Sequence, residues 1–205
     1  MNLKNGFTLA EVLITLVVVG VIAALTIPTV IYETKKTEYS SKLKKIYSAM
    51  TQAELRAKAD GKDWKIWMDA NFAETGLETT KTFSDKYLLP YLSYSKVDYD
   101  KNGWDVTVYF NDGLLLNIAK MTCLDFRIDL NGDKKPNARG RDNYYFLYCS
   151  QNHSSFALRE RFIPYQNGYY SRETALNLCK NSPQYCSALL SIDGWEYKDD
   201  YPHRL

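Results

Sequence analysis

Residues 6–31 read G-F-T-L-A-E-V-L-I-T-L-V-V-V-G-V-I-A-A-L-T-I-P-T-V-I, and this stretch decides how the chain is organised. Residues 12–31 contain no ionisable side chain. Roughly 20 apolar residues in a helix are enough to cross the hydrocarbon core of a bilayer. We therefore expect residues 7–31 to form a membrane-spanning helix, preceded by a leader of residues 1–6.

The leader differs from a secretory signal peptide. In a signal peptide the apolar region precedes the cleavage site and is removed with it. Here the apolar run directly follows six residues that include Lys4 and end in Gly6. A cut after Gly6 would therefore leave the span on the mature protein.

Glu11 places a carboxylate one turn into the apolar run. An isolated acid inside a bilayer costs on the order of a few kcal/mol, so such groups usually have a partner. A cut after Gly6 would create a new amine on Phe7, which lies close enough along the chain to pair with an acid at this depth.

Residues 6–16, G-F-T-L-A-E-V-L-I-T-L, resemble the prepilin cleavage and methylation motif of type IV pilins and type II secretion pseudopilins. The resemblance covers about the first 35 residues. It implies that a membrane-embedded peptidase cuts after Gly6 and methylates the Phe7 amine. It also implies that Glu11 neutralises the Phe7 amine of a neighbouring subunit during filament assembly. Pro28 falls where many pilins have a helix-kinking proline.

The same resemblance implies the partners and the location of the chain. The partners are the prepilin peptidase, other pilin or pseudopilin subunits, an inner-membrane assembly platform and, before assembly, membrane lipid. The implied location is a single pass through the bacterial inner membrane with the head in the periplasm or outside. Lys35 and Lys36 follow the span and oppose the positive-inside tendency, so this orientation depends on the family and on the cysteines. A plain anchor whose Glu11 snorkels to the interface is the alternative.

Residues 32–60 continue the helical period with a different polarity. Their apolar positions step by three and four, which is typical of an amphipathic helix: Tyr39, Leu43, Ile46, Tyr47, Met50 and Ala53. We expect one long helix that ends near Ala59, with Gly61 as its C-terminal cap. The apolar stripe should pack under a head formed by residues 61–205.

The head alternates with a period of two from Trp104 onward. Residues 104–110 and 114–119 form a predicted hairpin around the turn Asn111-Asp112-Gly113. Two further strands are predicted at residues 123–130 and 144–149. Together they give an antiparallel sheet of at least four strands against the helix, and hence an α+β, pilin-like fold. Short helices are predicted at residues 84–89, begun by Ser84 and ended by Pro90, and at residues 171–179, capped by Ser171.

All four cysteines lie beyond the span, and an even number in a translocated domain indicates disulfides. Sequence proximity favours Cys123–Cys149 and Cys179–Cys186 among three connectivities. A zinc site is the alternative, although no C-x-x-C or nearby His pair supports it. The resemblance makes residues 179–205 a candidate contact surface, because a Cys-bounded C-terminal region is often the exposed variable face of type IV pilins. Stapling of a chain end that would otherwise fray is the other interpretation.

Residues 129–142 form a polar loop that resembles the start of a calcium site. Asp129, Asn131 and Asp133 stand at alternate positions, where oxygen ligands can converge on one ion, and Asp142 would close the site. The glycine follows Asn131 rather than Asp133, and no Glu stands at the twelfth position. The alternative is a series of Asx-turns that shape a surface loop.

Composition excludes several functions. The 205 residues allow the span and one domain of ordinary size, and the net charge of +2 predicts no nucleic-acid partner. His153 and His203 lie in polar or terminal segments, and the chain has no G-x-S-x-G elbow or phosphate-binding loop. We expect no catalytic activity and no required cofactor.

The sequence thus predicts a pseudopilin of a type II secretion-like system. A major or minor type IV pilin used in adhesion, motility or DNA uptake is the second hypothesis. A membrane-tethered module whose aromatic-rich head recognises glycan is the third; the chain contains 17 Tyr and 4 Trp.

Overall fold

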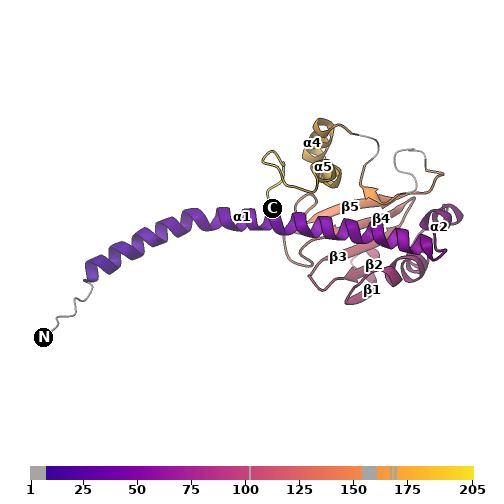
Figure 1. Cartoon of the computed structure of the whole chain (residues 1–205), viewed down its shortest axis with the longest axis horizontal. Coiled ribbons are helices and arrows are strands. Elements are labelled where there is room, and N and C mark those ends of the chain that lie inside the picture. The colour runs from indigo at the N-terminus through magenta and orange to yellow at the C-terminus, as the bar shows by residue number, and fades with distance from the viewer. Residues whose placement is uncertain (1–7, 102, 154–160, 167, 169) are drawn as a thin grey trace.

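One helix, α1 (Leu9–Ala59), runs through most of the length of the molecule (Figure 1). The computed structural model describes residues 8–101, 103–153, 161–166, 168 and 170–205. The 51 residues of α1 span about 75 Å at 1.5 Å per residue. Its N-terminal half extends away from the head, and its C-terminal half crosses the face of a sheet.

The predicted apolar stripe of α1 is confirmed as the part of the helix that enters the core. The buried residues of α1 are Tyr39, Leu43, Ile46, Met50, Ala53 and Ala57. Tyr47, the remaining residue of the predicted stripe, is half-buried against Trp195 at a ring-centroid distance of 4.9 Å. The helix ends as predicted, because Gly61 adopts a φ of +73° and Lys62 N–H donates to the Ala57 carbonyl at 2.8 Å.

The head contains one antiparallel sheet of six strands in the order β1-β2-β3-β4-β5-β6. The strands are β1 (Lys96–Lys101), β2 (Trp104–Tyr109), β3 (Leu115–Lys120), β4 (Leu124–Asp129), β5 (Asn143–Tyr148) and β6 (Ile163–Pro164). The four central strands confirm the predicted strands and the predicted α+β class. β1 and β6 were not predicted, because β1 reads K-V-D-Y-D-K with little apolar alternation and β6 has only two residues.

Alternate residues of β3, β4 and β5 form the inner face of the sheet. Leu116, Ile118, Phe126 and Phe146 are all fully buried and belong to the same core cluster as the α1 stripe. Trp64 of α2 (Trp64–Ala70) closes one end of this core, and its indole N–H donates to the Tyr87 carbonyl at 2.8 Å. The head therefore folds around the second half of α1.

The prediction of a helix at residues 84–89 placed its first residue wrongly. α3 (Leu77–Phe83) begins seven residues earlier, after Gly76, and continues without a break into a π-turn at Ser84–Leu88 and a 3₁₀ turn at Leu89–Tyr91. Ser84 is buried inside this helical run at the C-terminal end of α3, and its hydroxyl has no hydrogen-bond partner among the described residues. Three threonines within α3 weaken its local helix propensity, which explains why the sequence pattern missed it.

The C-terminal part packs two helices, α4 (Arg172–Asn181) and α5 (Cys186–Ile192), beside the sheet. Ser171 caps α4 as predicted, since its side chain accepts from Thr174 N–H. Disulfides join Cys123 to Cys149 and Cys179 to Cys186, which is the pairing favoured by proximity in the sequence.

Met50→Ala should lower the free energy of unfolding by about 2–5 kcal/mol, because Met50 is fully buried between α1 and the sheet. Leu55→Ala is the matched control on the same helix, because Leu55 is 61% exposed. Urea unfolding of the full chain in detergent micelles, followed by near-ultraviolet circular dichroism, measures both variants. An equal decrease in the free energy of unfolding in the two variants would contradict the proposed packing of α1.

Candidate assembly site

Glu11 lies in the first turn of α1, where it forms a capping box with Thr8. Its Oε2 accepts hydrogen bonds from Thr8 N–H and Thr8 Oγ1–H, both at 2.8 Å, while Glu11 N–H donates to Thr8 Oγ1 at 3.3 Å. The box satisfies two backbone N–H groups at the start of the helix. Within the part of the chain that the structure describes, Oε1 accepts no hydrogen bond. One oxygen of the acid is therefore without a partner among the described residues.

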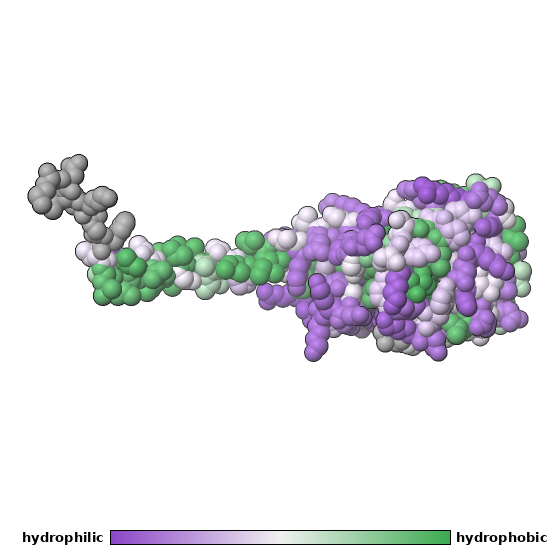
Figure 2. Space-filling view, turned by 90° about the horizontal axis from the view of Figure 1, so that it is seen from below, coloured by the Kyte–Doolittle hydropathy of each residue, from purple (hydrophilic) through white to green (hydrophobic). Residues whose placement is uncertain are grey.

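The segment around Glu11 is apolar on its whole circumference. The most apolar 18-residue window of α1 has a mean hydropathy of 2.6 and buries nothing inside the molecule. The large apolar side chains of this half are more than 40% exposed, and Figure 2 shows them as a green stalk that projects from the head. Among the described residues, α1 is the one helix long and apolar enough to cross a membrane.

Two of the hydroxyl groups in the span are satisfied by the helix itself. Thr15 Oγ1–H donates to the Val12 carbonyl and Thr26 Oγ1–H to the Ile22 carbonyl, each at 2.9 Å. Polar groups in hydrocarbon must find partners within the protein, and these two do. Glu11 is thus the one ionisable side chain among residues 8–31.

Gly6, Phe7 and Pro28 are the other predicted site residues of this region. Gly6 and Phe7, the predicted processing site, lie outside the described residues. Pro28 lies inside α1, where it has no N–H to donate to the carbonyl four residues earlier. Figure 1 shows α1 curving in its N-terminal half while it remains one continuous helix.

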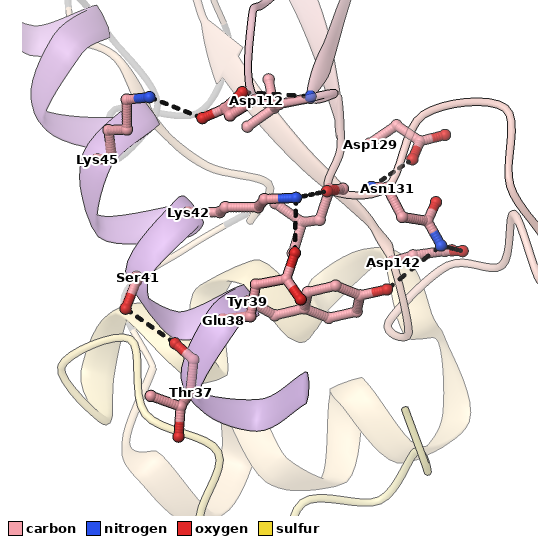
Figure 3. A network of polar contacts seen from close by, with 12 residues as sticks. Thr37, Glu38, Tyr39, Ser41, Lys42, Lys45, Asp112, Asp129, Asn131 and Asp142 are labelled. Atoms are coloured by element: carbon pink, nitrogen blue, oxygen red, sulfur yellow. Dashed lines mark hydrogen bonds and ion pairs between the residues drawn. The ribbon is translucent and has the colours of Figure 1, made fainter. Parts of the chain in front are cut away.

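The loop between β4 and β5 is fastened to α1 just beyond the span (Figure 3). Asn131 Nδ2–H donates to the Tyr39 hydroxyl at 3.2 Å, and Lys42 Nζ donates to the Leu130 carbonyl at 2.7 Å. Lys45 forms an ion pair with Asp112 of the neighbouring β2–β3 turn at 2.7 Å. These contacts fix the loop against the membrane-proximal part of the helix.

Asp142 organises the interior of this loop. Its Oδ1 accepts from Ala138 N–H at 2.6 Å and from the Asn143 amide at 3.0 Å, and its Oδ2 accepts from Asn137 N–H at 2.8 Å. Oδ2 also accepts from the Asn131 amide at 3.2 Å. The buried carboxylate thus holds four N–H donors. The loop also contains one Asx-turn, the motif of the alternative interpretation, at Asp129, whose Oδ1 accepts from Asn131 N–H at 3.2 Å.

The four residues predicted as calcium ligands do not converge as ligands in this arrangement. Asp142 is surrounded by N–H donors, Asn131 turns its Nδ2 rather than its Oδ1 toward Asp142, and Asp133 is exposed. Burial raises the pKa of Asp129 to about 6, which the Asn131 N–H partly opposes. Calcium would require this loop to rearrange, and its binding stays a prediction.

The two cysteine pairs exclude the zinc alternative in the described head. Cys123 and Cys149 lie near His153, and Cys179 and Cys186 lie near His203, but both pairs are disulfides and their sulfurs are not free thiolates. The ring nitrogen Nε2 of His203 lies 2.9 Å from the Cys179 carbonyl oxygen.

The C-terminal segment is fixed to the head by one arginine that the sequence analysis did not single out. Arg172 Nε donates to Asp193 at 2.6 Å, and its terminal nitrogens donate to Asp200 at 2.7 and 2.8 Å. Trp195 and Tyr197 between these acids are buried. Part of the predicted contact surface at residues 179–205 therefore belongs to the core, and bidentate Arg–Asp pairing could not be read from residues so far apart in the sequence.

An apolar stalk with one acid in its first turn, continuous with a helix that packs under an antiparallel sheet, defines a type IV pilin-like protein anchored by a single helix. A model of the prokaryotic N-terminal methylation motif matches residues 1–27. Residues 29–205 match a family of unknown function (DUF6613), and the chain belongs to that family. No curated protein and no solved structure matches the chain.

Asp142→Ala should lower the free energy of unfolding by about 2–4 kcal/mol, because it leaves the Asn137 and Ala138 N–H groups without their acceptor. Asp133→Ala, an exposed acid of the same loop, should change it by less than about 0.5 kcal/mol. Urea unfolding gives both free-energy changes. Faster amide hydrogen exchange at residues 131–142 should occur only in Asp142→Ala. A stable Asp142→Ala variant would contradict the role given to this carboxylate.

Proposed function

We propose that the chain is a filament subunit, a pseudopilin that is cleaved after Gly6, methylated on Phe7 and assembled into a pseudopilus of a type II secretion-like system. The observation that carries this proposal is Glu11. It is the one acid among residues 8–31, the exposed apolar half of α1, and it lies within a sequence that matches the methylation motif.

Assembly solves two problems that the isolated chain has. A helix with this much exposed apolar surface can leave the bilayer only if other apolar helices replace the lipid around it. Glu11 Oε1 needs a cation in the same apolar surroundings. A bundle of copies supplies both, because the methylated Phe7 amine of a neighbour can pair with Glu11 while the helices cover one another.

The C-terminal region supports a pseudopilin over an adhesive pilin. Type IV pilins often expose a Cys-bounded region as a variable face. Here the Cys179–Cys186 bridge closes a separation of only seven residues, and both cysteines are buried. Neighbouring genes for a secretin or a retraction ATPase would separate the two filament types directly.

A tethered binding module is the second candidate, favoured by a groove of about 440 Å³ on the sheet. Arg127 lies over the ring of Trp104 and Arg139 over the ring of Tyr145, at 5.2 and 5.1 Å from the ring centroids. Aromatic rings with polar side chains beside them suit a glycan. A tethered module would not use Glu11 to pair with a neighbouring subunit.

We propose a structural rather than a catalytic role for the head, with no cofactor required. The buried acid of the loop, Asp142, is used to hold backbone N–H groups, and Arg172 is used to hold the C-terminal segment. The partners proposed are the prepilin peptidase, the assembly platform and other subunits.

Glu11→Gln should reduce filament assembly at least tenfold. Glutamine can keep the capping box with Thr8 but has no charge for a neighbouring amine, and about 1.4 kcal/mol of lost pairing corresponds to that factor. Filaments sheared from cells and quantified by immunoblot measure the effect. Glu33→Gln is the control on the same helix beyond the span. Normal assembly of Glu11→Gln would favour the tethered module.

Calcium should raise the melting temperature of the full chain by several degrees if Asp129, Asn131, Asp133 and Asp142 rearrange around the ion. The measurement compares added calcium with chelator in the wild type and in Asp133→Ala, which removes one proposed ligand without disturbing the hydrogen bonds of Asp142. A melting temperature that stays the same with added calcium and with chelator would contradict the predicted calcium site.

A further inference from the structure

A cleft of about 390 Å³ lies between α1 and the β4–β5 loop, just beyond the membrane span. Tyr39 and Asn131 form its inner part, where they are hydrogen-bonded to each other. Four lysines and two acids line it: Lys35, Lys42, Lys134, Lys135, Glu38 and Asp112. The lining therefore has an excess of two positive charges.

Both acids of the cleft already have partners, and so does one of the lysines. Lys42 pairs with Glu38 at 2.9 Å and also donates to the Leu130 carbonyl. Asp112 pairs with Lys45 at 2.7 Å. Lys35, Lys134 and Lys135, in contrast, make no side-chain hydrogen bond or ion pair with another described residue. Three lysines from two separate segments thus line one cleft without an ion-pair partner among the described residues.

The loop presents its two lysines from a fixed backbone. Asp142 holds the Asn137 and Ala138 N–H groups on the C-terminal side of the lysines, and Asn131 is held by Tyr39 on their N-terminal side. A ligand that binds there need not order the loop, and this lowers the entropy cost of binding.

The height of the cleft above the membrane identifies its ligand. Lys35 lies four residues beyond Ile31, about 6 Å along the helix. The headgroup layer on each side of a bilayer is roughly 5–8 Å thick, so the Lys35 backbone lies at the level of the lipid phosphates when residues 7–31 span the hydrocarbon. Tyr32, next to Ile31, is a residue type that favours this interface.

We infer that this cleft binds the headgroup phosphate of an anionic phospholipid, of the phosphatidylglycerol class, before the subunit leaves the membrane. The inference rests on the proposed membrane-inserted subunit with its head outside. A zwitterionic headgroup would bring its own ammonium against three lysines, whereas phosphatidylglycerol brings only the phosphate and hydroxyl groups. The binding also gives a reason for lysines just beyond the outer end of the span, where the positive-inside tendency disfavours them.

The test uses the uncleaved full chain in nanodiscs of phosphatidylcholine mixed with phosphatidylglycerol, in the presence of chelator. Native mass spectrometry after release counts the lipids of each class that remain bound. Wild type should retain phosphatidylglycerol preferentially, and Lys35→Gln/Lys134→Gln/Lys135→Gln should lower the preference at least about tenfold. The control Lys62→Gln/Lys81→Gln/Lys86→Gln makes the same charge change away from the cleft and should keep the preference. Circular dichroism checks that both triple variants are folded.

Three results would overturn the inference. Equal loss of preference in both triple variants would mean that the net charge of the head, not the cleft, attracts the lipid. Displacement of the lipid by millimolar glycerol phosphate would mean a site for free anions. An unchanged preference in the cleft variant, together with lost filament assembly, would assign the lysines to carboxylates of a neighbouring subunit. The lipid count needs neither cleavage nor filaments. It therefore tests the cleft even if Glu11→Gln assembles normally and the proposed filament function is wrong.

Discussion

The structure depends on α1, a helix whose apolar surface must be kept from water along its whole length. Its two halves need different surroundings for this. Residues 39–57 of α1 place six side chains into the core of the head, where the sheet and Trp64 cover them. The N-terminal half has no such cover from the described residues of the chain. Lipid before assembly and other subunits after it are the two surroundings that can supply one. The head is therefore a folded domain built on the end of an exposed apolar helix.

The parts of the fold with strong periodicity could be predicted from the sequence. The stripe of α1, the hairpin around Asn111-Asp112-Gly113 and the α4 cap at Ser171 each have a local signal that tertiary contacts reinforce. α3 could not be predicted, because its threonines obscure the helical signal and its burial comes from Phe83 packing on distant tryptophans. β6 has two residues and is a strand only because β5 lies beside it.

The candidate site was predictable where chemistry is local in sequence. Glu11 stands out as an acid in an apolar run, and the structure adds the capping box that leaves one of its oxygens without a hydrogen bond from the described chain. The role of Asp142 was not predictable, because spacing suggests ligands while only geometry shows which atoms face inward. The cleft beside it joins residues about a hundred positions apart, Lys35 and Lys134, and no pattern in the sequence connects them.

The central claim is that the chain is processed and assembled as a prepilin-type subunit. The intact mass and N-terminal sequence of the protein, recovered from the membrane of its own host, test this claim most directly. The account predicts a chain that begins at N-methylated Phe7 and lacks residues 1–6. A chain that still begins at Met1, in cells with an active prepilin peptidase, would contradict it and leave α1 as an anchor for a tethered head.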